Sequence, residues 1–260
     1  RNSTIPTMSD PLIRQLVELS ARAWPSLVDE SFDGWRLRST DAATRRANSA
    51  LALSAGERTI DEKIARVEQF YRDRGQTPQF LIAPYVEPPE LDALLDARGY
   101  QLLTPTSLQT ADVRTVLEQT AREDGRTVHV DEQLSEVWSS AYLDIVRGEE
   151  DVQGDWAGIF GRIGAQKAFA RIDDAGHPAA IGVGVYEDGW LGIFGMGSRL
   201  DFRRRGAAIA VLRALVRWGR KQGAKNAYLQ VTVDNAPARA LYSRMGFTTL
   251  FDYHYRAAED

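Results

Sequence analysis

The stretch of this sequence best suited to bind an anion is a basic triplet followed by small residues. Arg203, Arg204 and Arg205 precede Gly206-Ala207-Ala208, where a strand-like run ends and a helical pattern begins. A helix start without bulky side chains leaves its first N–H groups open, and the helix dipole favours negative charge there. Arginine adds charge-assisted hydrogen bonds to phosphate oxygens. The pattern predicts a diphosphate site; the alternative is an ordinary basic turn or a solvated arginine cluster.

A second pattern follows about one helix and one strand later, and the two together resemble a known family. Arg203-x-x-Gly206-x-Ala208 is similar to the (Gln/Arg)-x-x-Gly-x-(Gly/Ala) signature of the GNAT superfamily, the acetyl-CoA-dependent N-acetyltransferases. Downstream, Asn235-x-x-Ala238-x-x-Leu241-Tyr242-x-x-x-Gly246-Phe247 resembles the second hallmark of that superfamily. The order and the separation of the two patterns strengthen the resemblance.

The resemblance implies acetyl-CoA as the cofactor, with its pyrophosphate at the basic loop. It also implies that the central strand splays from the following strand and pairs with the pantetheine arm. Gly192, Gly195 and Gly197 fit this, because glycine in a strand often marks a bulge or a close backbone approach. The cofactor-binding residues implied in this way are Met196, Gly197, Ser198, Arg203, Arg204, Arg205, Gly206, Ala207, Ala208, Asn235 and Tyr242.

The resemblance implies that Tyr242 is the catalytic residue. An amine attacks the thioester directly, without a covalent enzyme intermediate, and the phenol of Tyr242 protonates the departing thiolate as a general acid. The alternative is a core aromatic residue that packs over the following turn. Asn235 would cap the helix that carries Tyr242 and hydrogen-bond the cofactor arm, although a plain N-cap needs no ligand.

A general base is harder to assign. An alkylammonium has a pKa of about 10.4, so the acceptor must lose a proton before it attacks. The central strand, residues 190–196, carries no carboxylate, and Glu187 is the tentative base. Glu187 and Asp188 lie beside Gly189 and are also typical of a solvated hairpin turn. A water chain, or an acceptor amine of low pKa, would remove the need for a base.

Two other classes of function remain open at this point. A protein that binds acyl-CoA without turnover, as a sensor or an interaction partner, would explain the missing central-strand carboxylate, but the retained Tyr242 argues against it. Nucleic-acid binding through residues 203–205 is disfavoured by the net charge of −4. The favoured acceptor is an amine of a small molecule, peptide or protein, and the favoured state is a monomer or homodimer.

Composition narrows the class of protein further. The 260 residues, 43% of them hydrophobic and 26% charged, fit a soluble globular protein of one large or two smaller domains. No apolar run is long enough to cross a membrane and no segment reads as a secretory signal, so we expect a cytoplasmic protein without membrane partners. There is no cysteine, and the three histidines are far apart, so we expect no metal site.

The two halves of the chain carry similar patterns. Helix–Gly75–strand–helix–Gly99 parallels helix–Gly223–strand–helix–Gly246, which suggests a duplicated domain. The predicted fold is α/β (α+β), with two GNAT-like domains, each a mixed, mostly antiparallel sheet flanked by helices. The predicted division is an expression remnant (1–7), a degenerate GNAT-like domain (8–113), a connector (114–126) and a catalytic domain (127–260).

The first half lacks the residues of the two family patterns found in the second half. Ser54-Ala55-Gly56-Glu57 stands where Arg-x-x-Gly-x-Ala would be, and Leu95 matches Tyr242. Arg45 and Arg46 precede a strand rather than a helix, so we do not expect them to bind phosphate. We expect the first half to shape one side of the acceptor cleft.

Hydrophobic periodicity and turn residues predict the remaining elements. Helices are expected at 11–24, 59–74, 88–98, 130–142, from about 155, and at 207–222 with Arg213 on its outer face. Strands are expected at 32–39, 47–53, 79–83, 168–172, 179–185, 189–198, 228–233 and 248–255.

Overall fold

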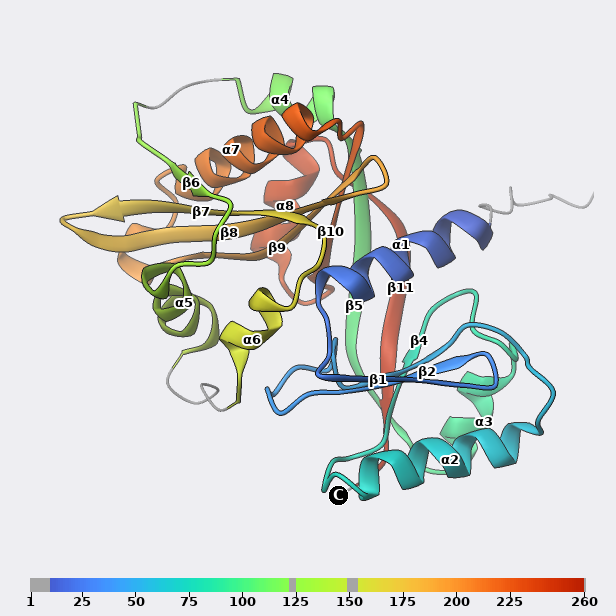
Figure 1. Cartoon of the computed structure of the whole chain (residues 1–260). Coiled ribbons are helices and arrows are strands. Elements are labelled where there is room, and N and C mark those ends of the chain that lie inside the picture. The colour runs from blue at the N-terminus through green and yellow to red at the C-terminus, as the bar shows by residue number, and fades with distance from the viewer. Residues whose placement is uncertain (1–9, 122–124, 149–153, 260) are drawn as a thin grey trace, which may run out of the picture.

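The computed structural model describes residues 10–121, 125–148 and 154–259 (Figure 1). The proposed expression remnant lies outside these ranges. The first half contains α1 (Asp10–Ala23), β1 (Val28–Phe32), β2 (Trp35–Ser39), β3 (Ala50–Ala52), α2 (Ile60–Arg72), β4 (Gln79–Ile82), α3 (Leu91–Ala97), β5 (Gln101–Asp112) and α4 (Val113–Gln119). The second contains β6 (His129–Asp131), α5 (Glu136–Tyr142), the π-helical turn η1 (Leu143–Arg147), α6 (Trp156–Gly161), β7 (Gln166–Asp174), β8 (His177–Glu187), β9 (Trp190–Ser198), the 3₁₀ turn η3 (Leu200–Phe202), α7 (Ala207–Gln222), β10 (Asn226–Thr232), α8 (Ala236–Arg244) and β11 (Thr248–Ala257).

The described strands form one continuous sheet of eleven strands, in the order β1-β2-β3-β4-β11-β5-β10-β9-β8-β7-β6. Within it only β3–β4 and β9–β10 pair in parallel, and the remaining neighbours are antiparallel. Each parallel pair is joined by a helix, α2 or α7, as a parallel connection requires. The predicted mixed, mostly antiparallel sheet flanked by helices is therefore confirmed.

The two halves exchange strands at the centre of the sheet. β5, from the first half, pairs with β10 and β11 of the second, and β11 pairs with β4 of the first. Figure 1 shows β5 and β11 side by side, running from one half of the molecule to the other. The proposed boundary at residue 113 thus separates the halves in sequence, but in space each half completes the sheet of the other.

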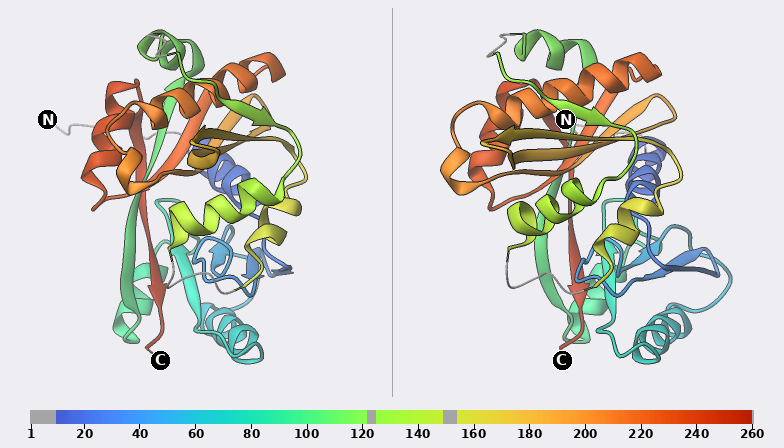
Figure 2. Two further views of the ribbon diagram at one scale, coloured as in Figure 1. Left: turned by 90° about the vertical axis from the view of Figure 1, so that its left-hand side faces the viewer. Right: turned by 60° about the vertical axis from the view of Figure 1, so that its left-hand side comes forward.

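Helices cover both faces of the sheet (Figure 2). Over the second half, α4, α7 and α8 pack on one face with a core that includes Val211, Leu215 and Phe247, all buried. The other face carries α1, α5 and α6, whose core includes Trp138 and Phe160. A third core under α2 and α3 fills the first half. α7 has the predicted bounds and ends at Gly223, which has a φ of 109°.

Two predicted elements were wrong at their boundaries. The expected strand 32–39 is instead a hairpin, because Asp33 and Gly34 both have positive φ (45° and 82°) and form a two-residue turn that pairs β1 with β2. The expected helix 130–142 begins only at Glu136, after Ser135, whose hydroxyl accepts a hydrogen bond from the N–H of Trp138. The residues before it form the short edge strand β6.

The described part of the proposed connector contains most of α4, and the strand β5 that precedes it was not predicted. β5 extends to Asp112, whose carboxylate caps α4 by accepting from the N–H groups of Arg114 and Thr115. Arg213 does not face outward as expected: it is buried and donates a hydrogen bond of 3.0 Å to the carbonyl of Thr120. This contact fastens the end of α4 to α7, and it could not be read from the periodicity of α7 alone.

Across the described ranges, no helix is long and apolar enough to cross a membrane.

Candidate active site

The two central strands of the second half separate part-way along their length. β9 and β10 pair in parallel over only four residues, from Trp190 opposite Asn226 to Ile193 opposite Leu229. Beyond this point β9 continues beside β8, and β10 continues beside β5 as far as Thr232. The backbone groups that face the split have lost their strand partner, and such groups need another one.

A bulge in β9 accompanies the split. The register with β8 steps from Phe194 opposite Val183 to Gly197 opposite Ile181, so β9 carries one extra residue, and Gly195 has a φ of 56°. A Cβ at Gly192 would lie 2.7 Å from the hydroxyl of Tyr228, and one at Gly197 would lie 2.7 Å from Val146. The three glycines of this strand therefore mark a bulge and two close approaches, as the sequence predicted.

The split opens a cavity of about 430 Å³. Its wall combines residues of β9 and β10 with residues of α8, of η1 and of the first half. They are Trp24, Ala43, Thr44, Arg45, Arg46, Thr104, Thr106, Tyr142, Val146, Arg147, Ile193, Phe194, Gly195, Met196, Leu229, Gln230, Val231, Thr232, Asn235, Ala238, Tyr242, Tyr253 and Tyr255. Tyr242 belongs to the core on the α7 face, whereas Trp24 belongs to the core on the α1 face. The cavity therefore reaches both faces of the sheet through the split.

Tyr242 lines this cavity from α8. It is 8% exposed, and its ring meets that of Phe247 edge-on at 5.9 Å. Burial raises the pKa of its phenol to about 12, so the hydroxyl is protonated at neutral pH. Asn235 also lines the cavity and caps α8, because its Oδ1 accepts a hydrogen bond of 3.2 Å from the N–H of Ala238.

The junction between β9 and α7 is open. Gly206, at the N-cap, has a φ of 83°, Arg204 has a φ of 60°, and no side chain caps the helix. Among the described residues, the N–H groups of Ala207, Ala208 and Ile209 have no hydrogen-bond partner. The side chains of Arg203, Arg204 and Arg205 are exposed. Unpaired donors and three cations thus meet at one helix end, an arrangement that suits an anion.

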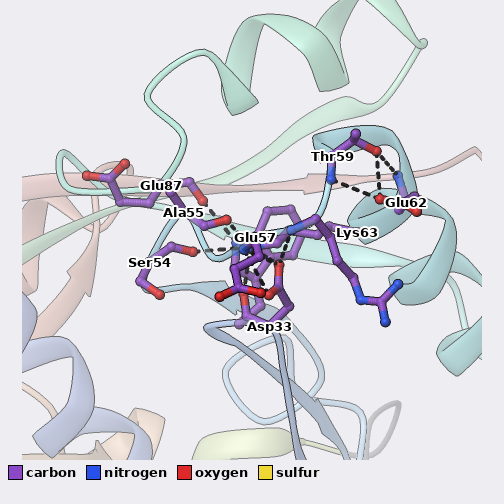
Figure 3. A network of polar contacts seen from close by, with 10 residues as sticks. Asp33, Ser54, Ala55, Glu57, Thr59, Glu62, Lys63 and Glu87 are labelled. Carbon is purple, nitrogen blue, oxygen red and sulfur yellow. Dashed lines mark hydrogen bonds and ion pairs between the residues drawn. The ribbon is translucent and has the colours of Figure 1, made fainter.

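The corresponding junction of the first half, between β3 and α2, is filled (Figure 3). The carboxylate of Asp33 accepts hydrogen bonds from the N–H groups of Glu57 (3.0 Å) and Arg58 (2.9 Å). Buried Lys63 donates to the carbonyls of Asp33 (2.6 Å), Ser54 (3.3 Å) and Ala55, and lies 3.0 Å from the Asp33 carboxylate. The backbone donors of this loop are therefore paired with a carboxylate of the protein itself.

The helix that follows this filled junction is also closed by its own residues. Thr59 and Glu62 form a reciprocal capping box at the start of α2: the hydroxyl of Thr59 accepts from the N–H of Glu62, and the Glu62 carboxylate accepts from the N–H of Thr59. The N–H groups of Thr59 and Glu62 at this helix start are thereby satisfied internally.

The structure does not bring every candidate residue to the cavity. Met196, Asn235 and Tyr242 line it, whereas Ser198 and Arg203 line a separate groove of about 740 Å³ between η1 and the basic loop. Glu187 lines neither: its Oε1 accepts a hydrogen bond of 2.9 Å from Nε of Arg22, beside the hairpin that starts β9. This ion pair keeps the tentative base at the opposite end of β9 from the split.

Sequence reasoning missed two polar residues of the cavity wall. Arg46 lies in the loop before β3 and Gln230 lies in β10, and both reach the cavity. Only for Gln230 was there a signal, because it is a polar residue inside a buried strand. Among the described residues, no group of histidine, aspartate and glutamate side chains could hold a metal ion.

Comparison with known proteins places this geometry in a family. Residues 11–256 match the family model described as "Probable histone acetyltransferase Rv0428c C-terminal". The chain belongs to this family. Two relatives extend over most of the chain: "Uncharacterized N-acetyltransferase YobR" of Bacillus subtilis is 29% identical over 94% of this chain and 98% of its own length. "Probable histone acetyltransferase Rv0428c" of Mycobacterium tuberculosis is 26% identical over 95% of this chain and 74% of its own length.

Solved structures show the fold of this member of the family. A GCN5-related N-acetyltransferase from Kribbella flavida superposes with a TM-score of 0.66, at 15% identity and over 95% of each chain. A tandem GNAT protein from the clavulanic acid biosynthesis pathway gives a TM-score of 0.65, at 14% identity, over 94% of this chain and 87% of its own. Family and fold together make the chain an acetyltransferase-type protein of the GNAT superfamily.

Proposed function

We propose that the chain transfers an acetyl group from acetyl-CoA directly to an amine. The observation that carries the proposal is the split between β9 and β10, which opens a cavity lined by Tyr242. The open helix start of α7, with its unpaired N–H groups and exposed arginines, would hold the pyrophosphate of the cofactor. The unpaired backbone of β9 at the split would pair with the amides of the pantetheine arm.

Tyr242 acts as the general acid in this proposal. The acceptor nitrogen attacks the thioester carbonyl carbon, the carbon–sulfur bond breaks, and the thiolate takes the proton of the Tyr242 phenol. A phenol with a pKa of about 12 is fully protonated at neutral pH and so has a proton to give. Water then reprotonates the phenolate.

The proton lost by the acceptor amine goes to water. Along the described wall of the cavity there is no aspartate, glutamate or histidine, and Glu187 is paired with Arg22 at the other end of β9. We therefore expect kcat/KM to rise with pH up to the acceptor's own pKa, near 10 for an alkylamine. Deprotonation of Tyr242 would not lower kcat/KM in that range, because its hydroxyl loses its proton only near pH 12.

Replacing the phenol tests the mechanism. With acetyl-CoA and a panel of amines, the protein should release free thiol, and Tyr242→Phe should lower kcat roughly 100-fold. Affinity for coenzyme A should stay within about threefold, because the ring still fills its place beside Phe247. Tyr186→Phe, which changes a tyrosine outside the cavity, is the matched control. A protein that is stabilised by acetyl-CoA yet releases no thiol with any amine would instead be a sensor.

The first half completes the site rather than repeating it. We propose that it is a degenerate GNAT-like copy whose junction at α2 no longer binds a cofactor and whose residues wall the acceptor side of the cavity. The amine of a protein lysine is one candidate acceptor, since the relative from M. tuberculosis is named a probable histone acetyltransferase.

A further inference from the structure

The cavity between β9 and β10 is cationic. Arg45, Arg46 and Arg147 line it, and none of the described residues of its wall is an aspartate or a glutamate. An acceptor that enters as an ammonium ion, with no other charge, would meet only like charges there. The electrostatics of the wall therefore favour an acceptor that brings negative charge of its own.

Arg46 is the cation with the least compensation. Its guanidinium carbon lies 4.8 Å from the ring centre of Trp24 and 5.7 Å from that of Phe194. It has no ion pair with any described residue, and its Nε is buried without a hydrogen-bond partner. Cation–π contacts offset part of the desolvation of a guanidinium, but an unpaired buried donor remains costly. An anion at this position would satisfy both the charge and the donor.

Two further polar atoms in the same wall are buried and unpaired. Nε1 of Trp24 is a donor without an acceptor, and Oε1 of Gln230 is an acceptor without a donor. Buried polar atoms are nearly always hydrogen-bonded, so three unpaired atoms in one cavity wall form a set of donors and acceptors that a polar ligand can satisfy. The two donors suit the oxygens of an anion, and the amide oxygen suits the N–H of an amine.

The backbone of Trp24 and Arg46 is held in place by hydrogen bonds from a buried arginine. Arg38 is buried and donates from Nη1 to the carbonyl of Arg46 at 2.8 Å and from Nη2 to the carbonyl of Trp24 at 2.7 Å. It thus fixes the backbone of both residues relative to each other. Such preorganisation lowers the cost of ordering side chains when a ligand binds.

We propose that the acceptor is an amine that also carries a carboxylate or phosphate group. Arg46 and Trp24 bind the anionic group, and the amide oxygen of Gln230 accepts a hydrogen bond from the amine. The proposal rests on the proposed acetyl transfer, but it concerns a different anion from the cofactor's phosphates. The donors for those phosphates, at residues 203–208, do not line this cavity.

Paired acceptors that differ only in the anionic group test this. Calorimetry on the full chain saturated with coenzyme A would compare β-alanine with β-alaninamide, 2-aminoethyl phosphate with ethanolamine, and a capped lysine as a neutral peptide amine. We expect the anionic member of at least one pair to bind at least roughly tenfold tighter, the worth of a charge-assisted hydrogen bond. Arg46→Gln should reduce that ratio to below about threefold.

Arg72→Gln, which removes an exposed arginine of α2 that does not line the cavity, should leave the ratio unchanged. Equal binding within every pair, tighter binding of the capped lysine, or a ratio that survives Arg46→Gln would overturn the proposal. Thiol release, measured separately with acetyl-CoA, reports on acetyl transfer. Binding of an anionic amine without thiol release would refute the transfer and keep the acceptor site.

Discussion

Two strand–loop–helix junctions in this molecule have the same topology and opposite chemistry. In each, a helix joins a parallel pair of strands, β3–α2–β4 in the first half and β9–α7–β10 in the second. The first junction is closed by Asp33 and Lys63, and the second leaves its N–H groups unpaired under three exposed arginines. Free N–H groups at such a junction favour an anion, and the chain supplies one, the carboxylate of Asp33, only at the first junction.

The comparison shows that one strand–loop–helix topology can carry either a filled junction or an open one. The carboxylate of Asp33 accepts hydrogen bonds from two N–H groups of the loop before α2, and Lys63 donates to the carbonyls of Ser54 and Ala55 in the same loop. The pKa of Asp33 falls to about 2, mainly because the N–H groups of Glu57 and Arg58 stabilise its charge. A phosphate would have to displace an ion that is already well bound. If Asp33 and Lys63 account for the difference between the junctions before α2 and α7, changes at either junction should have the following effects.

The largest effect is expected for Lys63→Met. It leaves three carbonyls and the Asp33 carboxylate without their buried cation, so the free energy of unfolding should fall by about 3 kcal/mol. Denaturant titration measures this, with Lys225→Met as an exposed control that should change stability little. A loss below about 1 kcal/mol would mean that Lys63 does not hold the loop.

Ala208→Asp should convert the open junction into a copy of the filled one. An added carboxylate at the start of α7 would occupy the free N–H groups and repel the pyrophosphate, so affinity for coenzyme A should fall roughly 100-fold, or about 2.8 kcal/mol. The fold should persist, because the helix dipole favours the charge. Ala208→Asn has the same shape without the charge and should lose far less; equal losses by calorimetry would contradict an electrostatic cause.

Asp33→Asn should destabilise the protein in a pH-dependent way. The folded-state pKa of Asp33 lies below its usual value of 3.8, so its contribution to stability is present above pH 4 and is lost as pH falls toward 2. The difference in unfolding free energy between the native chain and Asp33→Asn should therefore shrink over this range. Asp61→Asn, at an exposed carboxylate, is the control. A difference that stays constant down to pH 2 would argue against the ion pair.

The smallest effect is expected at Arg204. Its side chain is exposed, so Arg204→Gln should weaken coenzyme A binding only about threefold at low salt. The difference between the native chain and the variant should be smaller at higher ionic strength, because salt screens the charge of Arg204. Arg72→Gln should have no effect. A salt-independent loss of more than about 30-fold would show that Arg204 binds the phosphate in a buried, directional contact rather than through its charge alone.

The sequence by itself determined the second junction and its helix. Small residues after an arginine triplet, a helical period from Ala207 and a terminal Gly223 are local features, and local backbone preferences set the bounds of α7. The glycines of β9 likewise predicted a bulge or close approaches: Gly195 has the positive φ of the bulge, and a Cβ would not fit at Gly192 or Gly197. The roles of Tyr242 and the loop arginines remain predictions.

Only the tertiary structure decided the rest of the candidate site. That β5 of one half lies between β10 and β11 of the other depends on strand pairing across more than a hundred residues, which no local pattern encodes. This pairing brings Arg46 and Trp24 to the split beside Gln230, and it leaves Glu187 at the far end of β9. Hydrophobic period and turn residues fix which element a residue joins, but the packing of distant elements fixes which side chains share a cavity.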